Sequence, residues 1–210
     1  MEILYHDREL AVCVKPAGVL SEGSVADPRT APGLLAQALA EEGSTPRTIL
    51  PIHRLDRETR GIMVYALTES AAASLSRALT EGTIHKEYVA LVHGAPTADA
   101  GEMRDLLYYD RARNKSFPVK RERKGVKHAS LSYRVVARDP DTDISTVRVT
   151  LQTGRTHQIR VQFASRKMPL VGDRKYGAPA TDDNHLALTS VLLSFPHPKT
   201  GERMTFEIEP

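Results

Sequence analysis

Residues 53–61, His-Arg-Leu-Asp-Arg-Glu-Thr-Arg-Gly, hold side chains that could do acid–base or nucleophilic chemistry. Asp56 lies between two arginines, and the apolar run 61–67 that follows is typical of a buried strand. We therefore expect Asp56 on a loop that enters the core. Nearby guanidinium groups favour the ionised carboxylate, which makes Asp56 a candidate nucleophile or base. The alternative is a structural ion pair.

A second candidate group lies at residues 154–160, Gly-Arg-Thr-His-Gln-Ile-Arg, after the apolar strand 147–151. The glycine indicates a turn, and the spacing of Ile159 and Phe163 predicts a helix over 156–166. Helix N-termini and arginines both favour anions. An anion contact is one interpretation, and a surface turn with solvated arginines is the other.

Positive charge is concentrated in residues 111–127, which contain eight basic residues and one acidic residue, a net charge of +7. The whole chain carries +3, so the remainder carries −4. A basic segment on an acidic body indicates a contact with a polyanion. A solvated loop without a partner is the alternative.

Periodicity predicts an α+β protein with a mainly antiparallel sheet, because strands outnumber helices and no regular βαβ alternation is visible. Thr68 is the expected N-cap of the second helix, and Gly82 lies past its end. Residues 94–129 show no regular pattern. We predict helices over 34–40, 68–79 and 156–166, and strands over 9–14, 61–67, 84–92, 131–135, 147–151, 186–195 and 204–208.

The 210 residues suit a single domain, 1–210, with a basic loop near 108–128. No stretch approaches the roughly 20 apolar residues that a membrane-spanning helix needs. The first residues lack a secretory signal, and the one cysteine, Cys13, excludes an internal disulfide. These features favour the cytoplasm. Cys13 lies in an apolar run and is expected to be buried, although a reactive thiol is the alternative.

The chain resembles the RluA-type RNA pseudouridine synthases in five ordered motifs that cover most of its length. Asp56 and Gly61 belong to the His-Arg-Leu-Asp motif, and Arg60 stands where many members have serine. The other motifs are Lys-Pro-x-Gly, Lys-x-Tyr, Gly-Arg-Thr-His-Gln-Ile-Arg and Gly-Asp-x-x-Tyr-Gly. The five motifs occupy residues 15–18, 53–61, 86–88, 154–160 and 172–177.

The resemblance implies a mixed, mainly antiparallel sheet with flanking helices and an RNA-binding cleft. It also implies isomerisation of uridine to pseudouridine in RNA, with no cofactor and no metal. Some members carry an additional N-terminal RNA-binding module of the S4 type. Because the match begins almost at Met1, we expect the catalytic domain alone. RNA is the expected partner, no membrane contact is expected, and a monomer is the default.

The resemblance also assigns the expected catalytic residues, which are Asp56, Tyr88 and Arg160. Asp56 matches the essential aspartate of the family, and its carboxylate would attack the sugar or assist loss of a 2′-proton. Arg160 is the first choice of partner for Asp56. Tyr88 matches the active-site tyrosine, which would stack on uracil or help to remove the C5 proton. A half-buried structural tyrosine is the alternative.

Seven residues are expected to bind substrate. Arg54 matches a family residue that fills the space left by the flipped base, and a surface ion pair is its alternative. Lys15 would brace the floor of the cleft. His53 belongs to the same motif as Asp56, although structural hydrogen bonding is the preferred role for both His53 and His157. The remaining four are Arg155, Arg121, Arg123 and Lys124.

Two other classes of function remain open at this point. One is an RNA-binding protein or chaperone without catalysis, which the presence of Asp56, Tyr88 and Arg160 disfavours. The other is a glycosidase-like hydrolase, which would need a second catalytic acid. No second carboxylate lies in a comparable motif, although Asp173 stays open as that acid. Ribosomal RNA and transfer RNA are both possible substrates, and loops 19–31 and 94–129 are expected to select the target.

Overall fold

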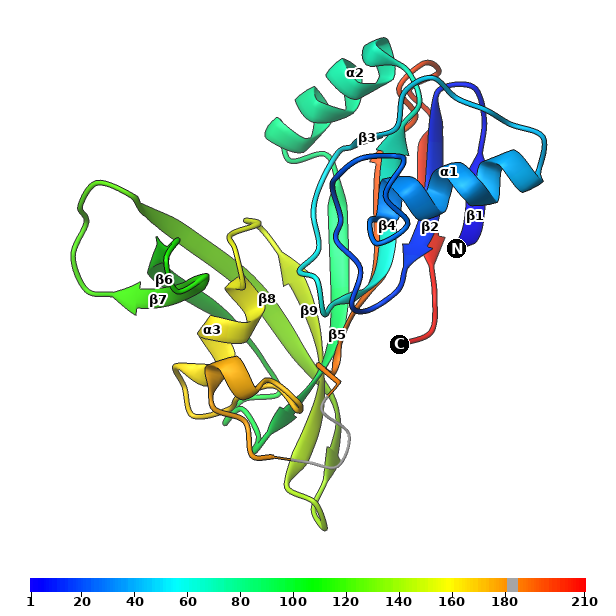
Figure 1. Cartoon of the computed structure of the whole chain (residues 1–210). Coiled ribbons are helices and arrows are strands. Elements are labelled where there is room, and N and C mark those ends of the chain that lie inside the picture. The colour runs from blue at the N-terminus through cyan, green and yellow to red at the C-terminus, as the bar shows by residue number, and fades with distance from the viewer. Residues whose placement is uncertain (181–184) are drawn as a thin grey trace. The chain divides into compact units, whose positions relative to one another are not determined.

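The computed structural model describes residues 1–180 and 185–210 of the chain (Figure 1). The chain divides into two compact units. The first unit contains residues 1–86 and 190–210, and the second contains residues 87–189. The candidate residues are therefore divided as well, with Asp56 in the first unit and both Tyr88 and Arg160 in the second.

The first unit is built on a sheet with the strand order β1-β2-β4-β10, in which β11 pairs with β10 and β3 pairs with β4. All six residues of β2 are buried, as expected of an apolar strand that is covered on both faces. Cys13 is fully buried within β2, and burial raises the pKa of its thiol to about 12. The strands are β1 (Glu2–His6), β2 (Leu10–Lys15), β3 (Leu50–Pro51), β4 (Arg60–Ala66), β10 (Leu188–Pro196) and β11 (Arg203–Glu207).

Two helices complete the first unit, α1 (Ala31–Glu41) and α2 (Glu69–Thr80). Thr68 caps α2 by accepting a hydrogen bond from the backbone N–H of Ala71, and Gly82 follows with a φ of +72°. Both features confirm the predicted boundaries of this helix. Buried residues of α2, among them Leu75, share one apolar cluster with β2, β4 and β10.

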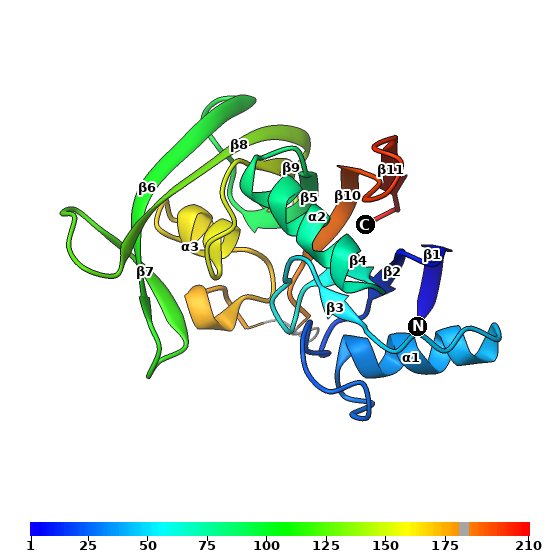
Figure 2. The ribbon, with the colours of Figure 1, turned by 90° about the horizontal axis from the view of Figure 1, so that it is seen from above.

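The second unit is a sheet with the strand order β5-β9-β8-β6-β7. The pairs β5–β9, β8–β9, β6–β8 and β6–β7 are all antiparallel. Figure 2 shows α3 on the concave side of the curved strands β6, β8 and β9. The elements are β5 (His85–His93), β6 (Ala100–Asp110), β7 (Lys115–Val119), β8 (Val126–Asp139), β9 (Ile144–Leu151), α3 (Gln158–Ala164) and the short 3₁₀ helix η1 (Arg174–Tyr176).

The α+β class, the mainly antiparallel sheet and the β8–β9 hairpin are confirmed. The expectation of an irregular segment over 94–129 is wrong, because most of it forms β6, β7 and the start of β8. These strands bury few side chains, such as Met103 and Leu107, so their apolar pattern is weak. Helix α3 is shorter than predicted, because His157 adopts a left-handed conformation with a φ of +54° and the helix begins at Gln158.

Candidate active site

Asp56 lies on the loop between β3 and β4 and is half-buried. The backbone is fixed on both sides of it. The Oγ of Ser21 donates to the carbonyl oxygen of Leu55 at 2.7 Å and accepts from the Leu55 N–H at 3.0 Å. The N–H of Thr59 donates to the carbonyl oxygen of Asp56 at 3.0 Å and closes a turn. The loop is therefore a structured holder for the carboxylate, as the sequence predicts.

Lys15 and Gly18 also stabilise the Asp56 loop, through hydrogen bonds to its backbone. The ammonium group of Lys15 donates to the carbonyl oxygens of Pro16, Val19 and Arg57, at 2.9, 2.9 and 3.1 Å. The N–H of Gly18 also donates to the Arg57 carbonyl, and the Arg57 Nε donates back to the Gly18 carbonyl at 2.8 Å. The Lys-Pro-x-Gly segment is thus hydrogen-bonded to Arg57, the residue that follows Asp56.

Lys15 is fully buried, which is rare for a lysine. Burial lowers its pKa to about 8, while the negative charges of Glu58 and Asp56 act in the opposite direction. All three ammonium hydrogens have carbonyl acceptors, so the buried cation is satisfied. Its place beneath the Asp56 loop agrees with the expected bracing role and leaves no surface for a direct RNA contact.

His53 is also buried, with 6% of its surface exposed. Its Nε2 accepts a hydrogen bond from the backbone N–H of Val64 at 3.4 Å, which ties the loop to β4. Burial, together with the positive charge of Lys86, lowers the pKa of His53 to about 3. These features favour the structural role of His53 over a contact with RNA.

Arg54 points to solvent, in contrast to His53 and Lys15. Its side chain is 61% exposed, and its Nη1 donates to Glu22 at 2.9 Å. A surface ion pair of this kind contributes about 1 kcal/mol or less. The Arg54 guanidinium can therefore leave Glu22 at little cost, and it is accessible to a substrate.

Gly61 shows why this motif ends in glycine. Its φ is +138°, and a Cβ placed on it would lie 2.4 Å from the carbonyl oxygen of Ser190 and 2.5 Å from its nitrogen. Both atoms are backbone, so they cannot move aside cheaply. Glycine is needed here for the close approach of two strands rather than for the chemistry.

Tyr88 lies on β5 and is 5% exposed. Its cross-strand partner is Val149, whose partner on β8 is Tyr133. Residues that are directly paired share one face of a sheet, and Tyr133 packs edge-on against Phe163 of α3, with ring centroids 5.9 Å apart. Tyr88 therefore belongs to the face that α3 covers.

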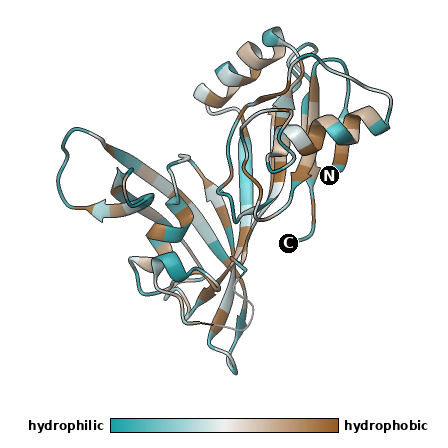
Figure 3. Cartoon of the chain, viewed as in Figure 1, coloured by the Kyte–Doolittle hydropathy of each residue, from teal (hydrophilic) through white to brown (hydrophobic). Residues whose placement is uncertain are grey.

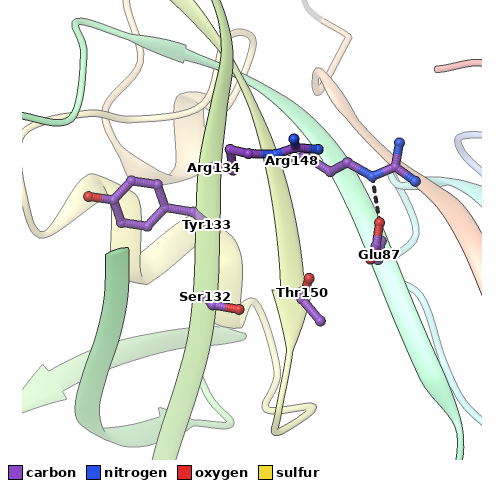
Figure 4. Close-up of a pocket in the computed structure, with 6 residues that line it drawn as sticks. All are labelled: Glu87, Ser132, Tyr133, Arg134, Arg148 and Thr150. Carbon is purple, nitrogen blue, oxygen red and sulfur yellow. Dashed lines mark hydrogen bonds and ion pairs between the residues drawn. The ribbon is translucent and has the colours of Figure 1, made fainter. Parts of the chain in front are cut away.

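The opposite face of the same strands carries a different, polar hollow (Figure 4). This hollow of about 160 Å³ includes Glu87, Thr150 and Arg148, and Arg148 forms an ion pair with Glu87. Glu87 and Thr150 are the chain neighbours of Tyr88 and Val149, so the alternation of a strand directs them to the other face. Tyr133 also lines this hollow, but the side chains of Glu87 and Tyr88 point to opposite faces of the sheet.

Arg160 lies on α3 and is 6% exposed. Its Nε and Nη2 donate to the two carboxylate oxygens of Asp173 at 2.7 and 2.8 Å. This paired geometry holds the guanidinium plane rigidly. Asp173 is 2% exposed, and both of its oxygens accept from Arg160, so a buried arginine partner describes it better than the second catalytic acid of a hydrolase.

Arg155 lies in the turn that precedes α3. Its backbone N–H donates to the Oε1 of Gln158 at 3.0 Å, and its Nε donates to the carbonyl oxygen of His128 at 2.8 Å. The turn is therefore shaped by hydrogen bonds within the second unit. A substrate contact of Arg155 stays a prediction.

The basic residues of segment 111–127 lie mostly on the surface, over the β6–β7 hairpin and the loop that leads to β8. Figure 3 shows that the loop between β7 and β8 is hydrophilic. Arg123 packs over the Tyr108 ring at 4.9 Å, and Arg121 and Lys124 are exposed. Such side chains are available to phosphates.

The described residues, 1–180 and 185–210, lack two kinds of feature. No group of three or more His, Cys, Asp or Glu side chains there could hold a metal ion. No helix in this part of the chain is long and apolar enough to cross a membrane.

Comparisons with known sequences identify one family. Residues 9–165 match the family model described as RNA pseudouridylate synthase. An uncharacterized RNA pseudouridine synthase of Aquifex aeolicus is 35% identical over 225 residues, covering 100% of this chain and 69% of the relative. The ribosomal large subunit pseudouridine synthase D of Vibrio cholerae is 35% identical over 221 residues, covering 98% of this chain and 66% of the relative.

A dual-specificity RNA pseudouridine synthase, RluA of Haemophilus influenzae, is 33% identical over 211 residues, covering 98% of this chain and 91% of the relative. Among solved structures, human RNA Pseudouridylate Synthase Domain Containing 4 aligns with a TM-score of 0.80. It is 23% identical and is covered to 88%, against 99% of this chain, so the likeness shows the fold.

Proposed function

The chain belongs to the RNA pseudouridylate synthase family, whose members are RNA isomerases, and we propose that it converts specific uridines of ribosomal or transfer RNA to pseudouridine, with Asp56 as the catalytic carboxylate. The observation that carries this proposal is the fixation of the Asp56 loop. Hydrogen bonds of Ser21, Lys15 and Gly18 hold the backbone on both sides of the one aspartate in the His-Arg-Leu-Asp motif.

The reaction breaks the C1′–N1 bond of uridine, turns the uracil and forms a C1′–C5 bond. N1 gains a proton and C5 loses one, so atoms balance without an external reactant. The carboxylate of Asp56 has two routes, attack on the sugar or assistance in the loss of a 2′-proton. Both routes need the anion, and we assign Arg160 as its cationic partner.

Tyr88 is assigned to the base itself. Its ring lies on the α3-covered face of the sheet, where it would stack on uracil, and its hydroxyl would assist removal of the C5 proton. A uridine within an RNA helix must first flip out, which costs a few kcal/mol. The exposed guanidinium of Arg54 is the group that we expect to fill the vacated stack.

RNA contacts outside the target nucleotide are assigned to Arg155 and to the basic residues Arg121, Arg123 and Lys124. The last three are exposed, and a phosphate backbone is the polyanion that such charges bind. The proposal extends to a monomer that acts in the cytoplasm. The relatives support an RNA substrate, since one is named for the ribosomal large subunit and another for dual specificity.

The direct test is release of tritium from RNA labelled at C5 of uridine. Ribosomal RNA and transfer RNA are purified separately from cells that lack the gene, and each is incubated with the protein. Release from either pool supports uridine isomerisation and identifies the target class. Release from neither pool, nor from assembling ribosomal particles, would contradict the proposal and favour an RNA-binding role without catalysis.

A further inference from the structure

Two side-chain pairs connect α3 to η1 in the second unit. The first is the paired hydrogen bond from Arg160 to Asp173. The second joins the Nδ1 of His157 to the hydroxyl of Tyr176 at 3.0 Å. His157 precedes Arg160 by three residues, and Tyr176 follows Asp173 by three residues. The two pairs therefore lie one after the other and connect the same two elements.

Tyr176 also contacts Arg160 itself. The Arg160 guanidinium carbon lies 5.3 Å from the centroid of the Tyr176 ring, within the range of a cation–π interaction. Asp173 thus holds the edge of the guanidinium group by hydrogen bonds, and the aromatic ring of Tyr176 contacts the same group. An arginine limited in both ways keeps one orientation.

The Tyr176 hydroxyl is itself held by β7, the second strand of the β6–β7 hairpin. It accepts from the N–H of Ser116 at 2.8 Å and donates to the carbonyl oxygen of Ser116 at 3.2 Å. The phenol hydroxyl has one hydrogen, which it donates to the Ser116 carbonyl oxygen. All three contacts are therefore satisfied when the Nδ1–H of His157 donates to the phenol oxygen. Edge-on packing of the two rings, with centroids 5.7 Å apart, agrees with this arrangement.

Ser116 and Lys115 add a second connection between β7 and this cluster. The Oγ of Ser116, which is 1% exposed, donates to the carbonyl oxygen of Thr156 at 2.6 Å, immediately before His157. The ammonium group of Lys115 lies 4.8 Å from the Tyr176 ring centroid and donates to the carbonyl oxygen of Lys175. The inner side of β7 therefore supports the start of α3, whereas most of the basic side chains of segment 111–127 are exposed.

We propose that Tyr176, held by Ser116 of β7, is a positioning residue that orients Arg160 for catalysis. This rests on the proposed catalytic role of Arg160. Segment 111–127 then has two separable tasks, since its exposed charges are proposed to bind RNA and its buried Ser116 keeps the Tyr176–Arg160 pair in place. Loss of the Tyr176 hydroxyl should lower the rate of the bound complex and leave RNA affinity unchanged.

The first variant is Tyr176→Phe, which keeps the ring and removes the three hydroxyl contacts. The rate at saturating RNA should fall about tenfold, because a small misplacement of a catalytic group is costly. The dissociation constant for RNA should stay close to that of the wild type, and the melting temperature should fall by only a few degrees, because the three lost hydrogen bonds are part-buried. Ser116→Ala, which removes only the contact with Thr156, should lower the rate by a smaller factor.

The matched control is Tyr109→Phe. Tyr109 lies on the same hairpin, and its hydroxyl donates to the Oδ1 of Asn114 at 2.7 Å, near the surface. Loss of this hydroxyl should leave both rate and affinity unchanged. Equal losses of rate in Tyr176→Phe and Tyr109→Phe would show a general effect of the hairpin and overturn the proposal.

A double-mutant cycle with Arg160→Lys tests whether Tyr176 acts through Arg160. In the Arg160→Lys background, Tyr176→Phe should cause little further loss of rate. A full additional tenfold loss there would overturn the positioning role. A normal rate in Arg160→Lys would instead contradict the proposed role of Arg160. A reduced rate in Arg160→Lys with a normal rate in Tyr176→Phe would overturn the Tyr176 inference alone.

Discussion

The Asp56 loop and the basic hairpin differ in how they hold their charged groups. The loop has no regular secondary structure around Asp56, yet hydrogen bonds fix the backbone of its neighbours Leu55 and Arg57. The β6–β7 hairpin is regular, yet most basic side chains of segment 111–127 are exposed. A catalytic carboxylate needs a single position, whereas phosphate contacts tolerate adjustment.

Lys15 and Lys124 show the same difference between a fixed and an exposed charged group. Lys15 is fully buried and has three carbonyl acceptors, so it acts on the loop rather than on a ligand. Lys124 is exposed on the β7–β8 connection. Substitution of the buried lysine should therefore reduce stability and rate, whereas substitution of the exposed basic residues should reduce RNA affinity.

The largest effect among the variants that leave Asp56 intact is expected for Lys15→Met, which removes the donor from three carbonyl oxygens. The free energy of unfolding should fall by about 3 kcal/mol, and the rate at saturating RNA by about 100-fold. Urea unfolding and single-turnover rates measure the two effects. Lys199→Met, at an exposed position between β10 and β11 of the same unit, is the matched control and should change neither. Equal rates in both variants would contradict the bracing role.

A smaller effect, on binding alone, is expected when Arg121, Arg123 and Lys124 are all changed to Gln. RNA affinity should fall roughly tenfold or more, and the slope of log K against log salt should become shallower by about 2 to 3. The rate at saturating RNA should stay the same. Filter binding over a salt series gives the slope. An unchanged slope would rule out phosphate contacts by these residues.

The smallest effect at neutral pH concerns the titration of His53, which acts on the stability of the first unit. The folded-state pKa of His53, about 3, lies below the ordinary histidine value of 6.5, so the unfolded chain takes up a proton first as the pH falls. The free energy of unfolding should therefore decrease between pH 6.5 and 3, by at most about 1.4 kcal/mol per pH unit from this group. His53→Gln should remove that contribution, as measured by urea unfolding at several pH values.

The control for this measurement is His85→Gln, at an exposed position of β5. It should keep the pH dependence of the wild type. A His53→Gln protein with the wild-type slope would show that His53 is not a buried neutral histidine. An RNA-binding defect without a change in slope would return His53 to the substrate-binding residues.

Elements with strong local signals could be predicted from the sequence. Helix α2 has Thr68 and Gly82 at its ends, and β2 and β4 are continuous apolar runs. Strands β6 and β7 could not, because their outer faces are polar and their buried residues are few. The burial of Lys15 has no local signal either, since one of its acceptors is the distant Arg57 carbonyl.

The candidate site was predicted in part for the same reason. The resemblance assigns Asp56, Tyr88 and Arg160 as expected catalytic residues, but the residues that support them come from other segments. Ser116 lies in a polar stretch and gives no signal in the sequence. Asp173 and Tyr176 belong to a motif that the sequence identifies, yet their contacts with α3 are known only from the structure.

The most direct test of the central claim compares Asp56→Asn with Glu58→Gln, two changes that each remove one negative charge from the same loop. Tritium release from uridine labelled at C5 is measured in a single turnover, alongside RNA affinity and melting temperature. We predict that Asp56→Asn folds, binds RNA and releases no tritium, whereas Glu58→Gln releases it at close to the wild-type rate. Wild-type release by Asp56→Asn would contradict the account.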